Sequence, residues 1–338
     1  MSSKVLLLFI LITNILLQIA DQKQLKGELM KIAIFGIGAI GGYIAGRLTN
    51  AGEEVSLISR GETLKVIRNS GLTIHNENKN YTVTPKNITD DPKEIGIVDT
   101  IIICVKADAV EIASEMIKPL IDKNTIIVQT QNGLTASQKI GQILGKEKVL
   151  EGICHFGAQV ISPGVIRGMA NSPRLTIAET NNEKSQRLLS LQSTLNNAGF
   201  NAVIPKSFQV DQWSKLMAVS ALGSIGAITR SNSPIWRQIP SVVEMWIKNM
   251  EETRDVAKSL NIDVPYQEIQ DRIDNLPQGV GSTSMHRDIA DGKPSEIEHQ
   301  IGSIVRIARE NNVTIPVNSF IYNALLPLEK LARGEISG

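Results

Sequence analysis

The stretch Lys31-Ile-Ala-Ile-Phe-Gly36-Ile-Gly38-Ala-Ile-Gly41 is the strongest indication of the fold of the first half of the chain. A short apolar run ends at Gly36, two further glycines follow at the G-x-G-x-x-G spacing, and a helical pattern begins after them. Gly36 allows a sharp turn, Gly38 lets the backbone approach a pyrophosphate, and Gly41 lets the helix pack closely on the strand. The stretch therefore predicts a strand, turn and helix that bind a dinucleotide. The alternative is an ordinary glycine-rich turn between a strand and a helix.

The cofactor contacts expected from this turn are mostly backbone contacts, because the first N–H groups of a helix are free and its positive dipole end favours phosphate. The residues expected to make them are consecutive in the sequence: Gly36, Ile37, Gly38, Ala39, Ile40 and Gly41.

The end of the second strand indicates which dinucleotide is bound. In NAD-binding sheets this strand usually ends in Asp or Glu, which holds the ribose 2′-hydroxyl. Here the strand Glu54–Ile58 is followed by Ser59 and Arg60. A carboxylate would repel a 2′-phosphate, whereas a guanidinium binds one with two hydrogen bonds. We therefore predict NADP(H), with Ser59 as an additional donor. The alternative is that Arg60 is a surface charge at the start of the next helix.

Length and composition describe an ordinary globular protein of about two domains, at ~150 residues per domain. The chain has 338 residues, of which 42% are hydrophobic and 20% charged, and its formal net charge is +1. That balance argues against a general nucleic-acid surface. Cys104 and Cys154 cannot form a disulfide framework, and both lie in apolar runs. Buried reduced thiols and a cytoplasmic location are expected. No Cys/His spacing indicates a metal site.

Residues 1–29 form a hydrophobic leader or a mis-assigned start. The run from Val5 to Leu17 is nearly all apolar but short for a membrane-spanning helix, and no clean small-x-small cleavage site precedes Asp21. Because the predicted first strand begins directly after Met30, translation from Met30 is the favoured interpretation. Secretion or membrane association would depend on this leader.

Residues 30–205 are predicted to form a Rossmann-type domain with a parallel sheet, because strands and helices alternate. The expected strands are Lys31–Phe35, Glu54–Ile58, Val98–Val105, Thr125–Gln129, Val149–Ile153 and Asn201–Ile204, with a hairpin of Leu72–His75 and Tyr81–Thr84. Short antiparallel strands are expected between Phe156 and Ile177. The expected helices are Ala39–Asn50, Gly61–Ser70, Ala107–Leu120, Thr135–Leu144 and Ser185–Ala198.

Residues 206–338 are predicted to form an all-α domain, because apolar residues recur there at the helical period. The expected helices are Phe208–Ser220, Val242–Ser259, Tyr266–Asn275, Ser295–Asn311 and Ile315–Arg333. The fold class is therefore α/β, with the sheet domain followed by helices. Helical domains of this kind often pair, so a homodimer is a further expectation.

Two more strands of the predicted sheet end in polar residues. Lys106 follows the strand Val98–Val105, and Asn132 follows Thr125–Gln129 within Gln131-Asn132-Gly133. Ligands of open parallel sheets lie beyond the carboxyl ends of the strands, so both side chains are candidates for contacts with cofactor or substrate. Taken singly, a lysine after a strand is usually solvated and Asn-Gly is a common turn.

Two motifs in the second half complete a resemblance to a known family. They are Trp213-Ser-Lys215-Leu and Ser284-Met-His-Arg-Asp288, the latter followed by Glu296-Ile. Together with the glycines, Lys106 and the Gln-Asn-Gly turn, they resemble ketopantoate reductase, or 2-dehydropantoate 2-reductase, from about Met30 to Leu331.

The resemblance implies an NADPH-dependent reduction of 2-dehydropantoate to (R)-pantoate, on the route to pantothenate and coenzyme A. It implies that Lys215 is the general acid and that Glu296 binds the substrate hydroxyl and supports catalysis. Ser284 and Asn132 would bind the substrate, and Lys106 would lie near both cofactor and substrate. Lys106, Asn132 and Glu296 would also bind the cofactor. An ammonium group suits the acid role because it can protonate a forming alkoxide and stabilise its charge.

One departure from the family puts the substrate in doubt. Family members often have asparagines four and eight residues after the lysine, whereas this chain has Val219 and Gly223. Ser220 or Ser224 would have to replace them. A reductase of another branched 2-oxo acid therefore remains an alternative, as does a non-catalytic NADP-binding sensor. Outside the resemblance, Lys215 would be a solvated helix lysine, and Glu296 a helix-opening charge behind the N-cap Ser295. Asp288 and Glu298 are expected to be surface charges.

Overall fold

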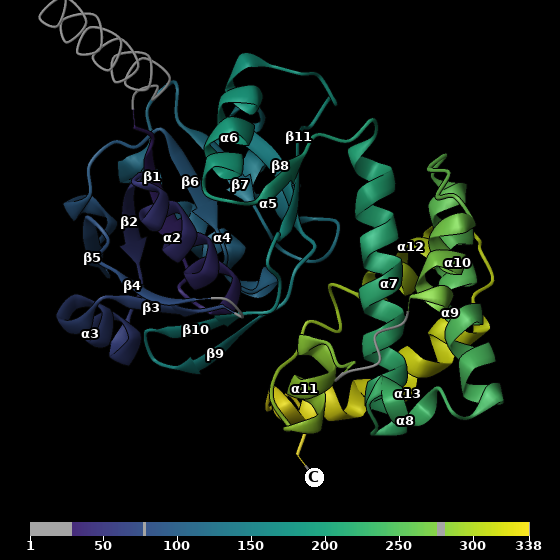
Figure 1. The fold of residues 1–338 in the computed structure, drawn as a ribbon. Helices are drawn as coiled ribbons and strands as arrows, with labels where there is room; N and C mark the ends of the chain where they lie inside the picture. The colour runs from purple at the N-terminus through teal and green to yellow at the C-terminus, as the bar shows by residue number, and fades with distance from the viewer. Residues whose placement is uncertain (1–28, 77–78, 276–280, 338) are drawn as a thin grey trace, which may run out of the picture.

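The computed structural model describes residues 29–76, 79–275 and 281–337, so the predicted leader up to residue 28 lies outside the described residues. Its larger sheet has eight strands with helices on both faces (Figure 1). Neighbouring strands of this sheet are parallel except β8 and β11. In spatial order the strands are β12 (Asn201–Val203), β11 (Arg174–Glu179), β8 (Val149–Cys154), β7 (Ile126–Gln129), β6 (Thr100–Ile103), β1 (Lys31–Phe35), β2 (Glu54–Ile58) and β5 (Asn87–Thr89).

Strand β1 lies at the point where the order of the sheet reverses. It pairs with β2 on one side and with β6 on the other, so that Phe35 stands opposite both Ile58 and Ile103. In an open parallel sheet this is where ligands bind, beyond the carboxyl ends of the strands. The predicted glycine turn follows β1 directly and therefore lies at that edge.

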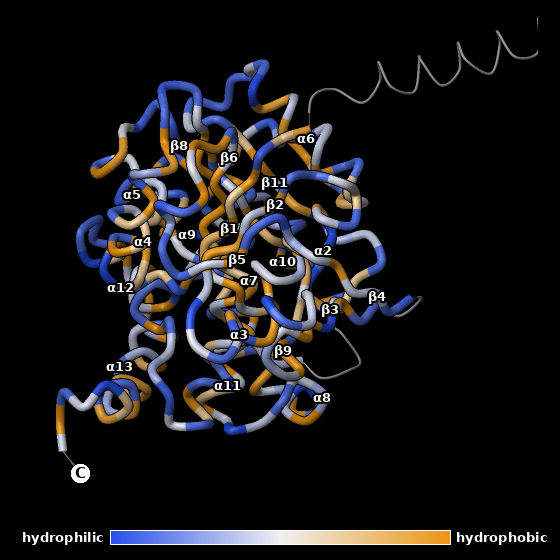
Figure 2. Tube along the Cα trace, turned by 90° about the vertical axis from the view of Figure 1, so that its left-hand side faces the viewer, coloured by the Kyte–Doolittle hydropathy of each residue, from blue (hydrophilic) through white to orange (hydrophobic). Residues whose placement is uncertain are grey.

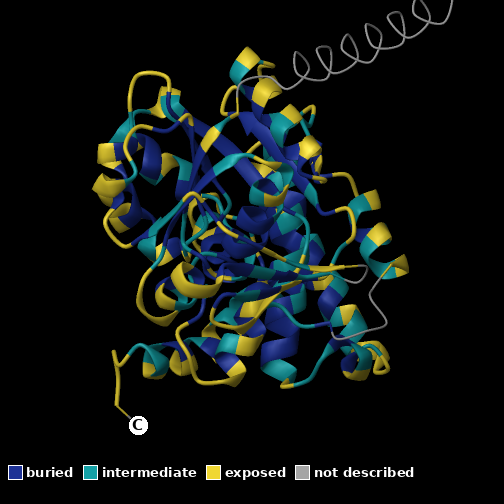
Figure 3. Ribbon diagram, turned by 60° about the vertical axis from the view of Figure 1, so that its left-hand side comes forward, coloured by how far each residue is buried: buried dark blue, intermediate teal, exposed yellow. Residues whose placement is uncertain are grey.

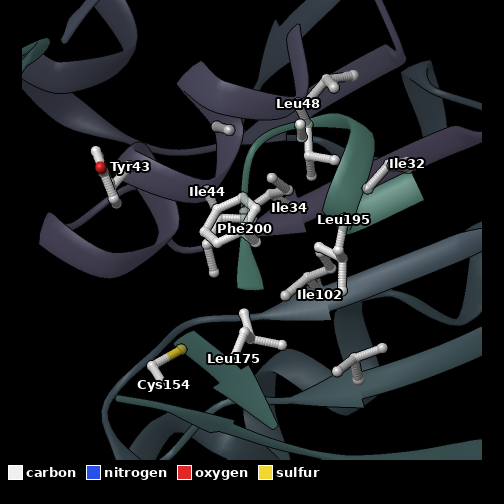
Figure 4. Close-up of a cluster of buried hydrophobic side chains, with 14 of the residues drawn as sticks. Ile32, Ile34, Tyr43, Ile44, Leu48, Ile102, Cys154, Leu175, Leu195 and Phe200 are labelled. Atoms are coloured by element: carbon white, nitrogen blue, oxygen red, sulfur yellow. The ribbon is translucent and has the colours of Figure 1, made fainter. Parts of the chain in front are cut away.

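The alternation of side chains along β1 builds two hydrophobic cores. Ile32 and Ile34 face α2 (Ala39–Ala51) and α6 (Gln186–Asn197), and Figure 4 shows them packed with side chains from these helices. Ala33 faces the opposite side of the sheet, against α4 (Val110–Met116) and α5 (Ala136–Leu144). Figures 2 and 3 show the central strands as hydrophobic and buried, as expected for a parallel sheet covered on both faces.

A smaller sheet covers the outer side of α2. Its strands, in spatial order, are β4 (Asn80–Val83), β3 (Leu72–His75), β10 (Val165–Gly168) and β9 (Ala158–Ser162). The pairs β3–β4 and β9–β10 are antiparallel, which confirms the predicted hairpin and the predicted antiparallel strands after Phe156. Helix α3 (Gly61–Ser70) lies between β2 and β3 in the chain and buries Leu64 and Ile67.

Every described element after β12 is helical. The long helix α7 (Phe208–Thr229) begins beside the larger sheet, where the hydroxyl of Ser207 accepts a hydrogen bond from the N–H of Val210. It continues into a second hydrophobic core with Leu216 and Met217. The other helices are α8 (Ser233–Trp236), α9 (Pro240–Ser259), α10 (Gln267–Asp274), α11 (Ser284–Ala290), α12 (Ile301–Glu310) and α13 (Pro316–Ala332). Among the described residues, no helix has both the length and the apolar character needed to cross a membrane.

Several predicted boundaries were wrong, for identifiable reasons. The helix predicted for Ala107–Leu120 is divided into α4 and short 3-10 turns, because Pro119 cannot continue an α-helix. Helix α7 runs nine residues beyond its predicted end at Ser220, since its small residues there pack against other helices. Helices α8 and α11 and strand β5 were not predicted. The remaining 3-10 turns are Pro92–Glu94 and Lys146–Lys148.

The helix predicted to begin at Ser295 begins instead at Ile301, as α12. Ser295 is not its N-cap: the hydroxyl of Ser295 accepts from the N–H of Ile297 and donates to Glu329. Glu296 therefore lies in a turn that precedes the helix rather than in its first turn.

Candidate active site

The turn after β1 has the geometry that a bound pyrophosphate requires. Gly36 has a φ of +96°, and a Cβ there would lie 2.9 Å from Val105. A Cβ on Gly41 would lie 2.0 Å from the carbonyl oxygen of Gly36, so only glycine fits between the turn and the helix. Gly38 is different, because no protein atom lies within 4 Å of the position its Cβ would take. The space beside Gly38 is therefore open to a ligand, whereas the space beside Gly36 and Gly41 is filled by protein atoms.

The start of α2 has the free donors that phosphate would use. Gly38 occupies the N-cap position with no side-chain cap, so the first N–H groups of the helix are left to a ligand or solvent. Ile37 is buried, and Ala39 and Ile40 are partly exposed. Because backbone N–H groups and an open approach coincide here, the turn fits a dinucleotide pyrophosphate.

Arg60 lies where a contact with the adenosine ribose is expected, at the carboxyl end of β2. It is exposed, and none of the hydrogen bonds or ion pairs among the described residues involves its guanidinium. Ser59 is partly exposed and its N–H is bound to the carbonyl of Thr89. An unpaired arginine beside the dinucleotide turn is suited to a 2′-phosphate.

The ends of β6 and β7 are tied together by side chains of the loop after β7. The hydroxyl of Thr130 donates to the carbonyl of Ile103, and the amide of Gln131 donates to the carbonyls of Ile103 and Val105. Cys104, at the end of β6, also lies beside Gly36 and Gly41. These contacts place the glycine turn, Lys106 and Asn132 at one edge of the sheet.

Lys215 and Asn132 line one small cavity. Lys215 comes from α7, and the cavity lies between this helix and the ends of β7 and β8. The amide of Gln212, one turn before Lys215, donates to the carbonyl of Gly133 at 3.0 Å and fixes the helix on the loop. The residues that line the cavity are Thr130, Gln131, Asn132, Gly133, Ile153, Cys154, Gln212, Lys215 and Leu216. The structure thus brings the predicted acid and one predicted substrate ligand together.

The surroundings of Lys215 are apolar and cationic. Burial lowers the pKa of Lys215; Cys154 partly offsets this shift, and Arg272 of α10 adds to it. Burial also lowers the pKa of His155, to about 3, and Arg174, Lys215 and Arg272 add to that shift. Cationic groups clustered around a buried amine favour an anionic ligand such as a carboxylate.

The two cysteines are free, and both are protonated at neutral pH. Burial raises the pKa of Cys104 to about 12 and raises that of Cys154 further. Neither is a nucleophile, because the reactive form of cysteine is the thiolate. Among the described residues, no cluster of His, Cys, Asp and Glu could hold a metal ion.

Glu296 and Lys106 take part in a second set of contacts between the sheet edge and the helical part of the chain. The N–H of Ala107 donates to Oε1 of Glu296 at 3.2 Å, and Nζ of Lys106 lies 2.9 Å from Oδ2 of Asp288 and 3.1 Å from the carbonyl of Pro294. Burial raises the pKa of Glu296, and the N–H of Ala107 partly offsets the shift. The expectation that Asp288 is a plain surface charge was therefore wrong, since it pairs with a residue of the sheet edge.

Ser284 is not brought to the Lys215 cavity. It is exposed in the first turn of α11, which packs on α7 at Gly223. Gly223 lies eight residues after Lys215, about 12 Å along the helix axis. A Cβ at Gly223 would lie 2.5 Å from the hydroxyl of Thr283 and 2.8 Å from the terminal methyl of Met285.

The serines considered as replacements for the asparagines are enclosed in the helical core. Both Ser220 and Ser224 are fully buried, and the Ser220 hydroxyl has no hydrogen-bond partner. The hydroxyl of Ser224 lies 3.4 Å from the carbonyl of Ala221, on its own helix. Neither lines the cavity of Lys215.

Three residues near the site were not predicted: Gln212, His155 and Arg272. Gln212 lies one helical turn before Lys215, so spacing alone could have placed it on the same face. His155 and Arg272 gave no local signal, because only the packing of α7 against β8, β11 and α10 brings them near Lys215.

Comparisons with known proteins match most of the chain to one family. Residues 32–182 match the family described as ketopantoate reductase PanE/ApbA, and residues 207–329 match its C-terminal part. The 2-dehydropantoate 2-reductase of Pyrococcus horikoshii is 28% identical over 306 residues, which cover 90% of this chain and 99% of that protein.

Solved structures give the same result. A PanE/ApbA family ketopantoate reductase from Ralstonia eutropha is 25% identical, with a TM-score of 0.81 over 90% of this chain and 100% of its own. A D-mandelate dehydrogenase with NADH and anilino(oxo)acetate shares the fold, with 22% identity and a TM-score of 0.80 over 90% of this chain and 99% of its own. Because the two family matches span most of the sequence and agree with the observed order of sheet and helices, the chain belongs to the ketopantoate reductase family.

Proposed function

We propose that this protein reduces the carbonyl group of a branched 2-oxo acid with NADPH, and that 2-dehydropantoate, giving (R)-pantoate, is the first candidate substrate. The observation that supports this most is the position of Lys215, a partly buried lysine that shares a cavity with Asn132 at the sheet edge where the dinucleotide turn lies. A protein that only bound the nucleotide would need no ammonium in that cavity.

The residues of the cavity suit the proton side of the reaction. When bound, the reduced nicotinamide supplies the hydride. The Lys215 ammonium would hold the carbonyl oxygen and donate a proton as charge develops on it. Arg272 and Lys215 together would attract the substrate carboxylate, and Asn132 would orient it. Glu296 would bind the substrate hydroxyl.

The choice of NADPH over NADH is supported by Arg60. The second strand has no acidic residue at its end, and the exposed guanidinium has no partner within the described residues. The D-mandelate dehydrogenase of the same fold was solved with NADH.

The assay that tests the proposal follows the loss of NADPH absorbance with 2-dehydropantoate. Lys215→Ala should lower kcat by about 10²- to 10⁴-fold, the usual contribution of a general acid. Lys258→Ala is the matched control, because Lys258 is an exposed lysine near the end of α9. Full activity of Lys215→Ala would refute the acid role, and no turnover by the wild type would refute this substrate.

A second candidate is a reductase of a different 2-oxo acid. Gly223 has no room for the asparagine that many family members have, and Val219 has no side-chain amide. The fold is also that of the D-mandelate dehydrogenase whose structure contains anilino(oxo)acetate. A panel of branched and aromatic 2-oxo acids, compared by kcat/KM, separates the two candidates. A non-catalytic sensor would bind NADPH and oxidise it with none of them.

A further inference from the structure

Three consecutive residues after β6 each contact the helical part of the chain. Lys106 pairs with Asp288, the N–H of Ala107 donates to Glu296, and Asp108 binds two groups at once. Oδ1 of Asp108 lies 2.6 Å from Nε2 of His299, and its Oδ2 lies 3.0 Å from Nη2 of Arg333. The loop that follows β6 is therefore held at successive positions by the turn around Glu296 and by α13.

The turn that contains Glu296 is itself held by a buried carboxylate. Glu329 of α13 is 2% exposed and accepts three hydrogen bonds from Ser295. Two come from the Ser295 N–H, at 3.0 and 3.1 Å, and one from its hydroxyl, at 2.6 Å. Because a buried carboxylate without partners is strongly unfavourable, these bonds leave Glu329 and Ser295 little freedom to separate.

Arg333 joins this buried group to the sheet domain. Its Nε donates to Glu329 at 2.6 Å, and its Nη2 donates to the carbonyl of Ser295 at 2.8 Å while also pairing with Asp108. The N–H, the carbonyl and the hydroxyl of Ser295 therefore all take part in hydrogen bonds. Glu296 is the next residue, and it lies in the turn before α12 rather than within a helix or strand.

We propose that Glu329 and Arg333 are positioning residues for Glu296: they fix the Ser295–Ile297 turn, and through Asp108 they fix it relative to the sheet domain. The inference rests on the proposed function, because it assigns Glu296 a role in the reaction. Neither Glu329 nor Arg333 contacts the cavity of Lys215, so their effect on catalysis passes through Glu296.

A double-mutant cycle tests the proposal. Glu329→Gln keeps the shape of the side chain and removes the charge that binds Ser295 and Arg333. We expect it to lower kcat/KM for the 2-oxo acid by 10-fold or more. In a Glu296→Gln background the same substitution should have almost no further effect, because the residue it positions is already lost. Equal losses in both backgrounds would overturn the proposal.

Glu252 provides a matched control in the same domain. It is also 2% exposed, and it binds the N–H groups of Val317 and Asn318 at the other end of α13. Glu252→Gln should lower the melting temperature about as much as Glu329→Gln but should leave kcat/KM almost unchanged. An equal loss of kcat/KM in Glu252→Gln would show that general destabilisation explains the effect, and would overturn the proposal.

Hydrogen exchange measures the positioning without turnover. The amides of Ser295 and Ile297 should exchange faster in Glu329→Gln than in the wild type and in Glu252→Gln. If this occurs in a protein that reduces no 2-oxo acid, the proposed function fails and the structural part of the inference stands. Unchanged exchange would overturn the inference whatever the activity.

Asp108→Asn gives a second variant that does not disturb a buried group, since the Asp108 side chain is 48% exposed. It should lower kcat/KM by a few-fold when Glu296 is present. In the Glu296→Gln background it should have no such effect. An unaltered kcat/KM would contradict the proposed link between the turn and the sheet domain.

Discussion

At the scale of single residues, burial gives Lys215 a property that most helix lysines lack. Its amine lies in a small cavity, and its pKa is lowered by burial and by Arg272. The sequence identified Lys215 only through its resemblance to a family motif, because an amphipathic helix with a lysine is otherwise unremarkable in composition. The position of Arg272, 57 residues later in the chain, could not be inferred from any local pattern.

The lowered pKa of Lys215 predicts the alkaline limit of activity. Lys215 must be protonated to act as an acid, so kcat/KM should fall as the pH rises through its folded-state pKa, which lies below the ordinary value of 10.5. Arg272→Gln removes a positive charge that lowers this pKa, so the alkaline limb should move to higher pH. A pH profile of kcat/KM tests this, with Arg309→Gln on the exposed face of α12 as the control. A limb that stays in place, or moves to lower pH, contradicts it.

Arg60 gives a prediction about cofactor choice. Replacing Arg60 by Ala should lower kcat/KM for NADPH by about 10- to 100-fold, because a hydrogen bond to a charged group is worth ~1.5–3 kcal/mol. The kcat/KM for NADH should hardly change, since NADH has no 2′-phosphate. Arg167→Ala, which removes an exposed arginine from β10, is the control. Equal losses with both cofactors would show that Arg60 does not select NADPH.

At the scale of elements, the packing of α11 on α7 explains part of the departure from the family pattern. Gly223 faces Thr283 and Met285 closely, so the two helices touch where many relatives have an asparagine. Helix α11 has only seven residues, and its motif was noted in the sequence without its being recognised as a helix. Its formation depends on the hydroxyl of Thr283, which accepts from the N–H of His286, and on the buried Met285.

An asparagine introduced at position 223 should destabilise the protein more than one introduced at position 219. Gly223→Asn should destabilise the protein by about 1–3 kcal/mol, because its side chain would overlap Thr283. Val219→Asn should be tolerated better, since Val219 is only partly buried. Urea unfolding of both variants checks the difference. If Gly223→Asn is as stable as the wild type, the contact with Thr283 does not restrict this position.

At the scale of the whole molecule, the candidate site depends on how the helical part sits on the edge of the larger sheet. Gln212 binds Gly133, Glu296 binds Ala107, and Asp288 binds Lys106. Each contact joins a residue from one half of the sequence to a loop in the other. The boundary predicted between residues 205 and 206 stays a prediction, as do the leader and a homodimer.

The pairing of Lys106 with Asp288 predicts an effect on ligand binding. An anionic ligand must compete with Asp288 for Lys106, so Asp288→Asn should bind NADPH or the 2-oxo acid more tightly. The gain should be at most about fivefold, because partly exposed ion pairs contribute ~0–1 kcal/mol. Asp291→Asn, which removes the partner of Lys293 instead, is the control. NADPH fluorescence titration and the KM for the acid measure the effect, and weaker binding would contradict it.

The α/β class, most strands of the larger sheet and the dinucleotide turn could be predicted from the sequence. These features depend on local chemistry: apolar runs of strand length, glycines at a fixed spacing, and helical periodicity between them. The boundaries of α7 and α12 could not be predicted from local sequence, because they depend on distant parts of the chain. Ser220 is buried by other helices, and Ser295 is held by Glu329, 34 residues away.

Which of the predicted site residues lie together depends on tertiary packing. It brought Lys215 to Asn132 and Glu296 to Ala107, left Ser284 exposed on α11, and added Arg272 and His155 to the surroundings of the amine. The physical reason is that burial and the electrostatic effects of neighbouring charges act through space. Sequence spacing reports neighbours along one helix or strand, whereas the pKa of Lys215 depends on groups that only packing brings close.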